Sequence, residues 1–116
     1  MLHEEYLELQ RSLDSHIHPY HNKFVIVRCA AGVFAGTLKN CYNNRVILEN
    51  SRRLYRWHTA NNGLTLSEVG VFGINPANSK ICVSEPTKEL WGISEITPCS
   101  LESRQTIERA VAYVVR

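Results

Sequence analysis

Tight turns between apolar segments constrain the fold of this chain more than any other feature. Residues 23–30 and 33–42 are strand-like and are separated by an Ala-Ala-Gly connection, and Asn43-Asn44 separates the second segment from a third over 45–57. Strands joined by so few residues must pair antiparallel, because a parallel pair needs a crossover of about a dozen residues. We therefore expect an antiparallel meander, with a break or bulge near Asn50-Ser51 in its third strand.

An amphipathic helix is predicted before the meander, over about residues 2–15. Its apolar residues follow spacings of four, three and four, which places them on one stripe of a helix. Pro19 then ends the helix. Such a narrow stripe suits docking on the domain's own sheet or on a second subunit, and the sequence leaves both open. The residues of the stripe are Leu2, Tyr6, Leu9 and Leu13.

The rest of the chain completes an α+β domain. Residues 64–69 have the composition of a short helix, 70–80 that of a loop, and 80–84 and 90–97 those of further strands. Ser100 is the predicted N-cap of a final helix whose buried stripe is Ile107, Ala110, Val111 and Val114. We expect one domain over 1–116, comprising an acidic helix and connector (1–20), an antiparallel sheet of about five strands (23–98) and a C-terminal helix (100–114).

Several sequence features favour an intracellular protein. The longest apolar runs are far shorter than the roughly 18 residues that cross a bilayer. The first ten residues are acidic, whereas a signal peptide is basic. The four cysteines form no CxxC pair, which argues against a disulfide framework or a zinc site. We expect a cytoplasmic location and no membrane partner.

Charge is distributed unevenly along the chain. Residues 21–56 hold seven Lys and Arg residues against Glu49 alone, a net charge of +6, whereas residues 1–20 hold one Arg against four acidic residues, a net charge of −3. Arginine outnumbers lysine nine to four, which suits bidentate contact with phosphate. The sheet is therefore a candidate binding site for an anionic ligand. The alternative is a solvated basic face that matches the acidic helix of a neighbour.

Arginine and aromatic residues alternate in RRLYRW (52–57), and this pattern indicates nucleotide binding, because bases stack on rings and phosphates pair with guanidinium groups. Alternation in a strand places Arg53, Tyr55 and Trp57 on one face and Arg52, Leu54 and Arg56 on the other. Alternatively, the aromatic residues are core and the arginines extend to solvent. Loop 70–80 has the composition of a lid over a nucleotide. The ten candidate ligand-binding residues are Arg28, Phe34, Arg53, Arg56, Trp57, Phe72, Asn75, Asn78, Arg104 and Arg109.

Sequence motifs of catalysis are missing. The chain has no Walker-type phosphate loop, no GxSxG, no HExxH and no GxGxxG after a strand. His16, His18 and His21 surround a proline and indicate a polar connector rather than a metal cage. We therefore expect neither enzymatic activity nor a metal or cofactor.

Several segments resemble the type 1 anti-Thoeris sponges, a family of small phage proteins. They are VRCAAGVFAGTL (27–38), RRLYRW (52–57) followed by Thr59-Ala60 and LTLSEV (64–69), GINPANSK (73–80), and EITP (95–98) before a helix. The resemblance covers residues 23–114 and leaves the role of residues 1–22 open.

This resemblance implies a specific function. Such proteins bind and sequester cyclic ADP-ribose isomers made by bacterial TIR enzymes, without cleaving them, in the host bacterial cytoplasm. They form dimers and higher assemblies with ligand pockets at subunit interfaces, so a homo-oligomer (a dimer or a hexamer) is expected here. Some members also hold cyclic oligonucleotides in a separate site.

Two other function classes compete with a cyclic-nucleotide sponge. A single-stranded nucleic-acid binder needs a longer continuous basic track and a steep salt dependence. A phage structural or assembly protein needs a large apolar patch and no response to a small molecule. Since a longer basic track than this sequence has would be needed, we do not expect nucleic acid as a partner.

Overall fold

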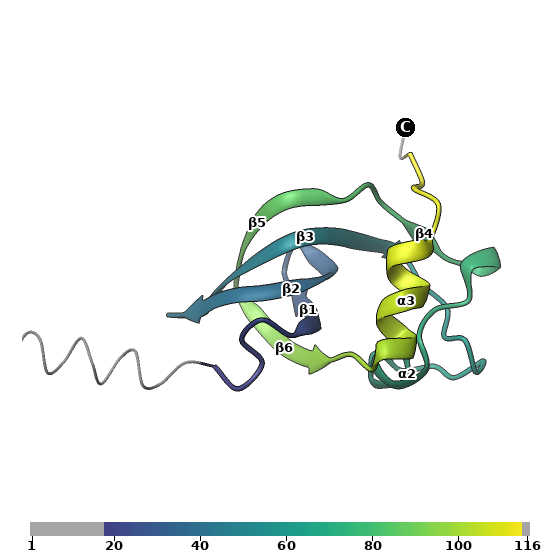
Figure 1. Cartoon of the computed structure of the whole chain (residues 1–116), viewed down its shortest axis with the longest axis horizontal. Helices are drawn as coiled ribbons and strands as arrows, with labels where there is room; N and C mark the ends of the chain where they lie inside the picture. The colour runs from purple at the N-terminus through teal and green to yellow at the C-terminus, as the bar shows by residue number, and fades with distance from the viewer. Residues whose placement is uncertain (1–17, 115–116) are drawn as a thin grey trace, which may run out of the picture.

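The computed structural model describes residues 18–114 and shows an α+β domain with an antiparallel sheet (Figure 1). This confirms the predicted class, although the sheet has six strands rather than about five. The helix predicted over 2–15 lies outside the described residues. The elements are β1 (Phe24–Cys29), β2 (Gly32–Tyr42), β3 (Arg45–Arg56), α2 (Leu66–Phe72), the 3-10 turn η1 (Pro76–Asn78), β4 (Lys80–Ile81), β5 (Glu85–Trp91), β6 (Ile93–Pro98) and α3 (Leu101–Arg109).

The sheet coils until its two edges meet. Strands β1, β2 and β3 form the predicted meander, β6 pairs with the outer edge of β1, and β5 pairs with the outer edge of β3. Strands β5 and β6 lie at opposite edges of the sheet, although only one residue, Gly92, separates them in the sequence. Gly92 has a φ of +68°, a conformation that favours glycine. The two edges are therefore brought together at Gly92, and the sheet forms a half-open barrel around which β5 and β6 curve (Figure 1).

A bulge in β3 changes which face its side chains occupy. Ala35 and Thr37 of β2 face Arg52 and Glu49 of β3, so β3 carries one extra residue there, and Asn50 has a left-handed φ of 52°. The bulge lies where the sequence predicts it. Gly36 lies opposite, where a Cβ atom would come within 2.9 Å of the Ser51 Cα atom, so only glycine fits.

Two apolar cores lie on the two faces of the sheet. Residues of β1 to β3 and β5 fill the barrel, and other residues of β1 to β3 pack outward against α2 and α3, which cover one side of the sheet (Figure 1). Strand β1 contributes to both cores, which explains its continuous apolar run. The barrel core contains Val25, Val27, Cys29, Phe34, Leu38, Val46, Leu48 and Leu90, and the helix-side core contains Phe24, Ile26, Ala35, Leu54, Leu66, Val69, Ile74, Ile81 and Ile107.

The last helix is shorter than the sequence predicts. Ser100 caps it and Ile107 is buried, but α3 ends at Arg109, and Val111 and Val114 are 92% and 64% exposed rather than part of a buried stripe. Beyond α3 the chain runs beside β4, where the Tyr113 N–H donates to the Ile81 carbonyl at 2.8 Å. The prediction of a helix to residue 114 is therefore wrong, because this segment pairs with a strand.

The prediction of one strand over 90–97 is also wrong. Gly92 divides this region into β5 and β6, and β5 begins at Glu85. Six of the seven β5 residues are exposed or half-buried. The sequence of this edge strand is therefore mostly polar and lacks the pattern that predicts a strand. Within residues 18–114, no helix is long and apolar enough to cross a membrane.

Candidate functional site

A cavity of about 570 Å³ opens at one mouth of the barrel, between the β1–β2 turn and the end of β5. The ring of Phe34 contributes to it from the barrel core and is only 3% exposed. Two cations lie over this ring, with the Arg53 Cζ atom 5.6 Å and the Lys88 Nζ atom 5.5 Å from its centroid. The cavity therefore combines an aromatic face with two positive charges.

Sheet register brings these three side chains together. Phe34 and Arg53 are direct partners across β2 and β3, and such partners lie on the same face of a sheet. The Arg53 Nη2 atom donates to the Ala31 carbonyl at 2.9 Å, which holds the guanidinium beside the turn. Gly32, at a φ of +139°, leaves room for it, since a Cβ atom there would lie 3.0 Å from Nη2.

Of the two cations, only Lys88 is compensated by an acidic group among residues 18–114. Lys88 pairs with Glu85 at 3.3 Å, and Glu89, which lines the cavity, pairs with Arg45 at 3.7 Å. No ion pair within residues 18–114 involves Arg53. Its guanidinium therefore keeps donors that an anionic ligand can use.

The structure places the other predicted ligand residues away from the barrel mouth. Arg28 and Trp57 share a cavity of about 260 Å³ with Glu95, whose carboxylate lies 4.0 Å from the Arg28 guanidinium. Arg56 and Asn78 share one of about 390 Å³ with His58 and Lys80. The ten candidates therefore form several separate groups rather than one site.

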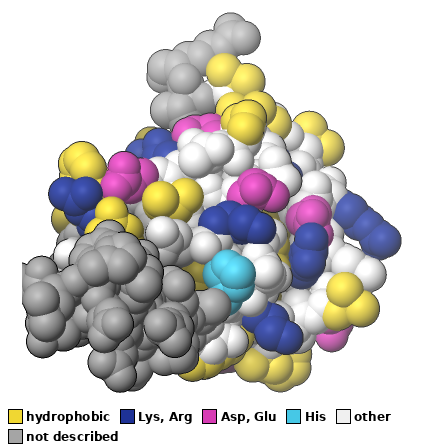
Figure 2. Space-filling view, turned by 60° about the vertical axis from the view of Figure 1, so that its left-hand side comes forward, with side chains coloured by type: hydrophobic (Ala, Val, Ile, Leu, Met, Phe, Trp, Pro, Cys, Tyr) yellow, Lys and Arg dark blue, Asp and Glu magenta, His cyan; other side chains and the backbone are white. Residues whose placement is uncertain are grey.

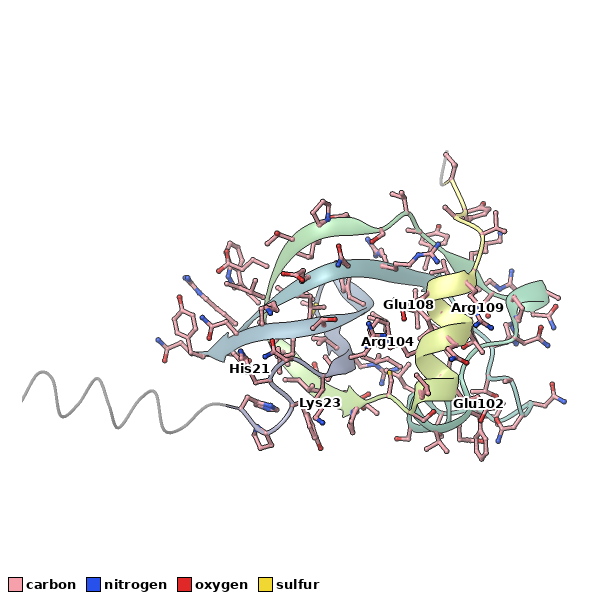
Figure 3. The ribbon with its side chains drawn as sticks, in the orientation of Figure 1. His21, Lys23, Glu102, Arg104, Glu108 and Arg109 are labelled. Atoms are coloured by element: carbon pink, nitrogen blue, oxygen red, sulfur yellow. The ribbon has the colours of Figure 1, made fainter. Side chains whose placement is uncertain are left out.

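Four remaining candidates lie elsewhere. The Asn75 side chain accepts from the Ala77 N–H and caps η1, and Phe72 at the end of α2 is 42% exposed. No residue of loop 70–80 lines the barrel-mouth cavity, so this loop is not the lid over it that the sequence predicts. Arg104 projects from α3 toward β1, over the Phe24 ring at 5.3 Å (Figure 3), and pairs with Glu108 at 2.6 Å. Arg109 lines a separate cavity of about 270 Å³ on α3. Basic and acidic side chains are interspersed on the face shown in Figure 2.

Arg53 and Arg56 do not point to opposite faces as alternation predicts. The pairing of β3 with β4 shifts by one residue between Leu54 and Arg56, and Arg56 faces Lys80. Because the shift is a local bulge, Arg56 lies on the same side as Lys80 and Arg53. Alternation holds from Arg52 to Tyr55 and fails at Arg56. The prediction that Trp57 shares a face with Arg53 and Tyr55 is wrong for the same reason, because Trp57 packs against the helix-side core that contains Leu54.

Lys88 and Arg52 have roles in the structure that the sequence pattern does not reveal. Lys88 lies between two predicted strands, and nothing in its neighbouring sequence indicates a binding role. Arg52 is 7% exposed and donates to the carbonyls of Cys82 (2.8 Å), Ile107 (2.8 Å) and Ala110 (2.6 Å). Burial lowers the pKa of its guanidinium from the ordinary value. Arg52 therefore fastens the end of α3 to the sheet and is not a ligand residue.

The described residues offer no metal centre. Within 18–114, no group of three His, Cys, Asp or Glu side chains is placed to hold an ion, and His16 lies outside this range. All four cysteines are free thiols.

Comparison with known proteins identifies a family. Residues 22–107 match a family described as a domain of unknown function, DUF6948, and this match covers most of the chain. The chain belongs to the DUF6948 family. No curated protein and no solved structure matches it. The DUF6948 segment includes the barrel and most of α3, so Phe34, Arg53 and Lys88 all lie inside it.

Proposed function

We propose that this DUF6948 protein is a phage anti-defence sponge, which sequesters a cyclic nucleotide signal in the host bacterial cytoplasm without cleaving it. The observation that carries the proposal is the pair of cations, Arg53 and Lys88, over the Phe34 ring in the barrel-mouth cavity. The resemblance to type 1 anti-Thoeris sponges names the ligand class, which is a cyclic ADP-ribose isomer.

The cavity has the size and chemistry for such a ligand. Its volume of about 570 Å³ falls inside the range of roughly 300–1,000 Å³ found for small-molecule sites. Arg53 offers its planar donor fork to a phosphate, and Lys88 supplies a second charge. Trp91 lines the cavity and is 60% exposed, so its ring is available to stack on a base or ribose.

The lining favours binding over catalysis. Glu89 is the one carboxylate among the lining residues, and it also accepts from the Trp91 Nε1–H at 3.3 Å besides pairing with Arg45. A general base held in this way is poorly placed to activate water or a nucleophile. This supports a protein that returns its ligand intact.

Self-association is part of the proposal. The resemblance implies ligand pockets between subunits, and exposed Tyr42 and Trp91 lie near Arg45, which pairs with both across the sheet. Sedimentation equilibrium at micromolar concentration tests this part. A dimer or hexamer is expected, and a clean monomer contradicts it.

Calorimetric titration with cyclic ADP-ribose isomers tests the ligand. Arg53→Ala should weaken binding roughly 10- to 100-fold, because it removes a charge-assisted contact. Arg109→Ala, which removes the same charge from α3, is the matched control and should bind normally. Ligand released by heat is then measured by mass spectrometry. Hydrolysed ligand, or equal binding by the Arg53 variant, contradicts the proposal.

A further inference from the structure

A basic–aromatic row extends from the barrel mouth along one face of β3. Side chains from four strands and from the segment after α3 form it, and they are far apart in the sequence. The row consists of Lys88, Phe34, Arg53, Tyr55, Tyr113, Lys80 and Arg56.

Contacts are found within each of the two groups that form the row, Phe34 with Arg53 and Lys88, and Tyr55 with Tyr113 and Lys80. The rings of Tyr55 and Tyr113 stack with centroids 6.2 Å apart and planes 14° apart, and the Lys80 Nζ atom lies 4.7 Å from the centre of the Tyr113 ring. Tyr55 is 50% exposed and Tyr113 is 37% exposed. Part of the aromatic surface of each residue is therefore accessible to a ligand.

Strand pairing explains why these residues share a face. Leu54 and Ile81 are partners and both belong to the helix-side core, so their neighbours Tyr55 and Lys80 lie on the opposite side of the sheet. Arg53 is two positions before Tyr55 and lies on that same side. Residues of the barrel-mouth cavity and of the cavity lined by Arg56 and Lys80 therefore lie on one face of β3.

The segment after α3 is held in place by the fold. The Tyr113 N–H donates to the Ile81 carbonyl at 2.8 Å, and the Ala110 carbonyl accepts from buried Arg52 at 2.6 Å. Tyr113 is thus positioned beside Tyr55 by backbone contacts on both sides of it in the chain.

Charge along the row has one sign. Of its four cations, only Lys88 takes part in an ion pair among residues 18–114. A linear ligand that carries several negative charges and flat rings matches this combination, because phosphates pair with the cations and bases stack on the exposed surfaces of Tyr55 and Tyr113, whereas the Phe34 ring is buried. An acidic peptide would satisfy the cations but leave the rings unused.

We propose that the basic–aromatic row binds a short single-stranded nucleic acid, an activity beyond sequestration of a cyclic nucleotide, with which it shares Phe34, Arg53 and Lys88 at the barrel mouth. The ring faces accept only unstacked bases, which excludes a duplex. The structure supplies the continuous basic track that the sequence lacks, because Lys80, Lys88 and Tyr113 join the residues of β3.

Fluorescence anisotropy with a labelled ten-residue oligothymidylate tests the proposal. Saturable binding is expected at low salt. Four phosphate contacts predict a slope of roughly −3 in a plot of log K against log salt concentration. The double variant Tyr55→Ala/Tyr113→Ala should bind at least fivefold more weakly, whereas Tyr55→Phe/Tyr113→Phe should bind normally. Circular dichroism spectra and melting curves establish that each variant is folded.

A second pair of variants tests the part of the row that lies outside the cyclic-nucleotide site. Arg56→Ala/Lys80→Ala should lose oligothymidylate binding at least tenfold but titrate with a cyclic ADP-ribose isomer like the unchanged protein. Arg28→Ala/Arg109→Ala, with the same loss of charge away from the row, is the control and should keep oligothymidylate binding. Equal binding of a hairpin duplex or of polyglutamate, or no binding of oligothymidylate, overturns the proposal. If oligothymidylate binds and the cyclic nucleotide does not, only the sponge function fails.

Discussion

Replacing Arg52 with alanine should destabilise the protein strongly, although the residue lies in a segment that resembles a ligand site. The side chain donates three short hydrogen bonds, two of them to carbonyls at the end of α3. Hydrogen bonds from a charged donor contribute about 1.5–3 kcal/mol each, and the desolvation of a buried guanidinium offsets part of this. We expect a net loss of about 3–4 kcal/mol in the free energy of unfolding, and a melting temperature lower by roughly 15–25 °C.

Urea denaturation followed by circular dichroism measures this loss. Arg52→Lys should lose less, because it keeps the charge but not the planar donor fork. Arg56→Ala is the matched control, since it removes a guanidinium from an exposed position of the same strand, and it should change stability by less than about 0.5 kcal/mol. A loss below about 1 kcal/mol for Arg52→Ala would refute the structural role assigned to this residue.

Three further predictions concern other positions. Gly32→Ala should lower the free energy of unfolding by about 1–2 kcal/mol, because residue 32 has a φ of +139° and a new Cβ atom would crowd Arg53. Chemical denaturation measures this loss, and an unchanged midpoint contradicts the expected backbone strain. Phe72→Ala should lower the melting temperature by only a few degrees, because Phe72 is 42% exposed. It should leave the affinity for the cyclic nucleotide unchanged, because the residue lies outside the barrel-mouth cavity. A tenfold loss of affinity would show that Phe72 contacts the ligand as a lid residue. Burial raises the pKa of the Cys99 thiol from 9.0 to about 11. Between these pH values the folded state keeps a proton that the unfolded state loses. The free energy of unfolding should therefore be unaffected by this thiol below pH 9 and fall by at most about 1.4 kcal/mol per pH unit up to about pH 11. Urea denaturation of Cys99→Ser at the same pH values should lack this component, and an equal decline in both proteins contradicts it.

The local signals in the sequence were sufficient for the meander but not for the barrel. Short turns and alternation located β1, β2 and β3, and the Asn50-Ser51 signal located the bulge. Coiling depends on Gly92 joining strands from opposite edges, which no local pattern reveals. The sequence does not predict β5 as a strand, because β5 lies at an edge of the sheet and most of its residues are polar.

The candidate site was predictable only in part, for the same reason. Arg53 and Phe34 were among the predicted ligand residues, and the structure makes them direct neighbours. Lys88 joins them through pairing between β3 and β5, which is long-range information. Alternation failed at Arg56 because a second bulge in β3 depends on the two-residue strand β4.

Chemical-shift perturbation by a cyclic ADP-ribose isomer, measured on ¹⁵N-labelled protein, tests whether the barrel mouth binds the ligand. We expect the largest changes in backbone amide shifts to cluster around the barrel mouth, at residues 30–34, 53 and 88–92. No change at saturating ligand, or changes confined to the cavity of Arg28 and Trp57 or to α3, would contradict it.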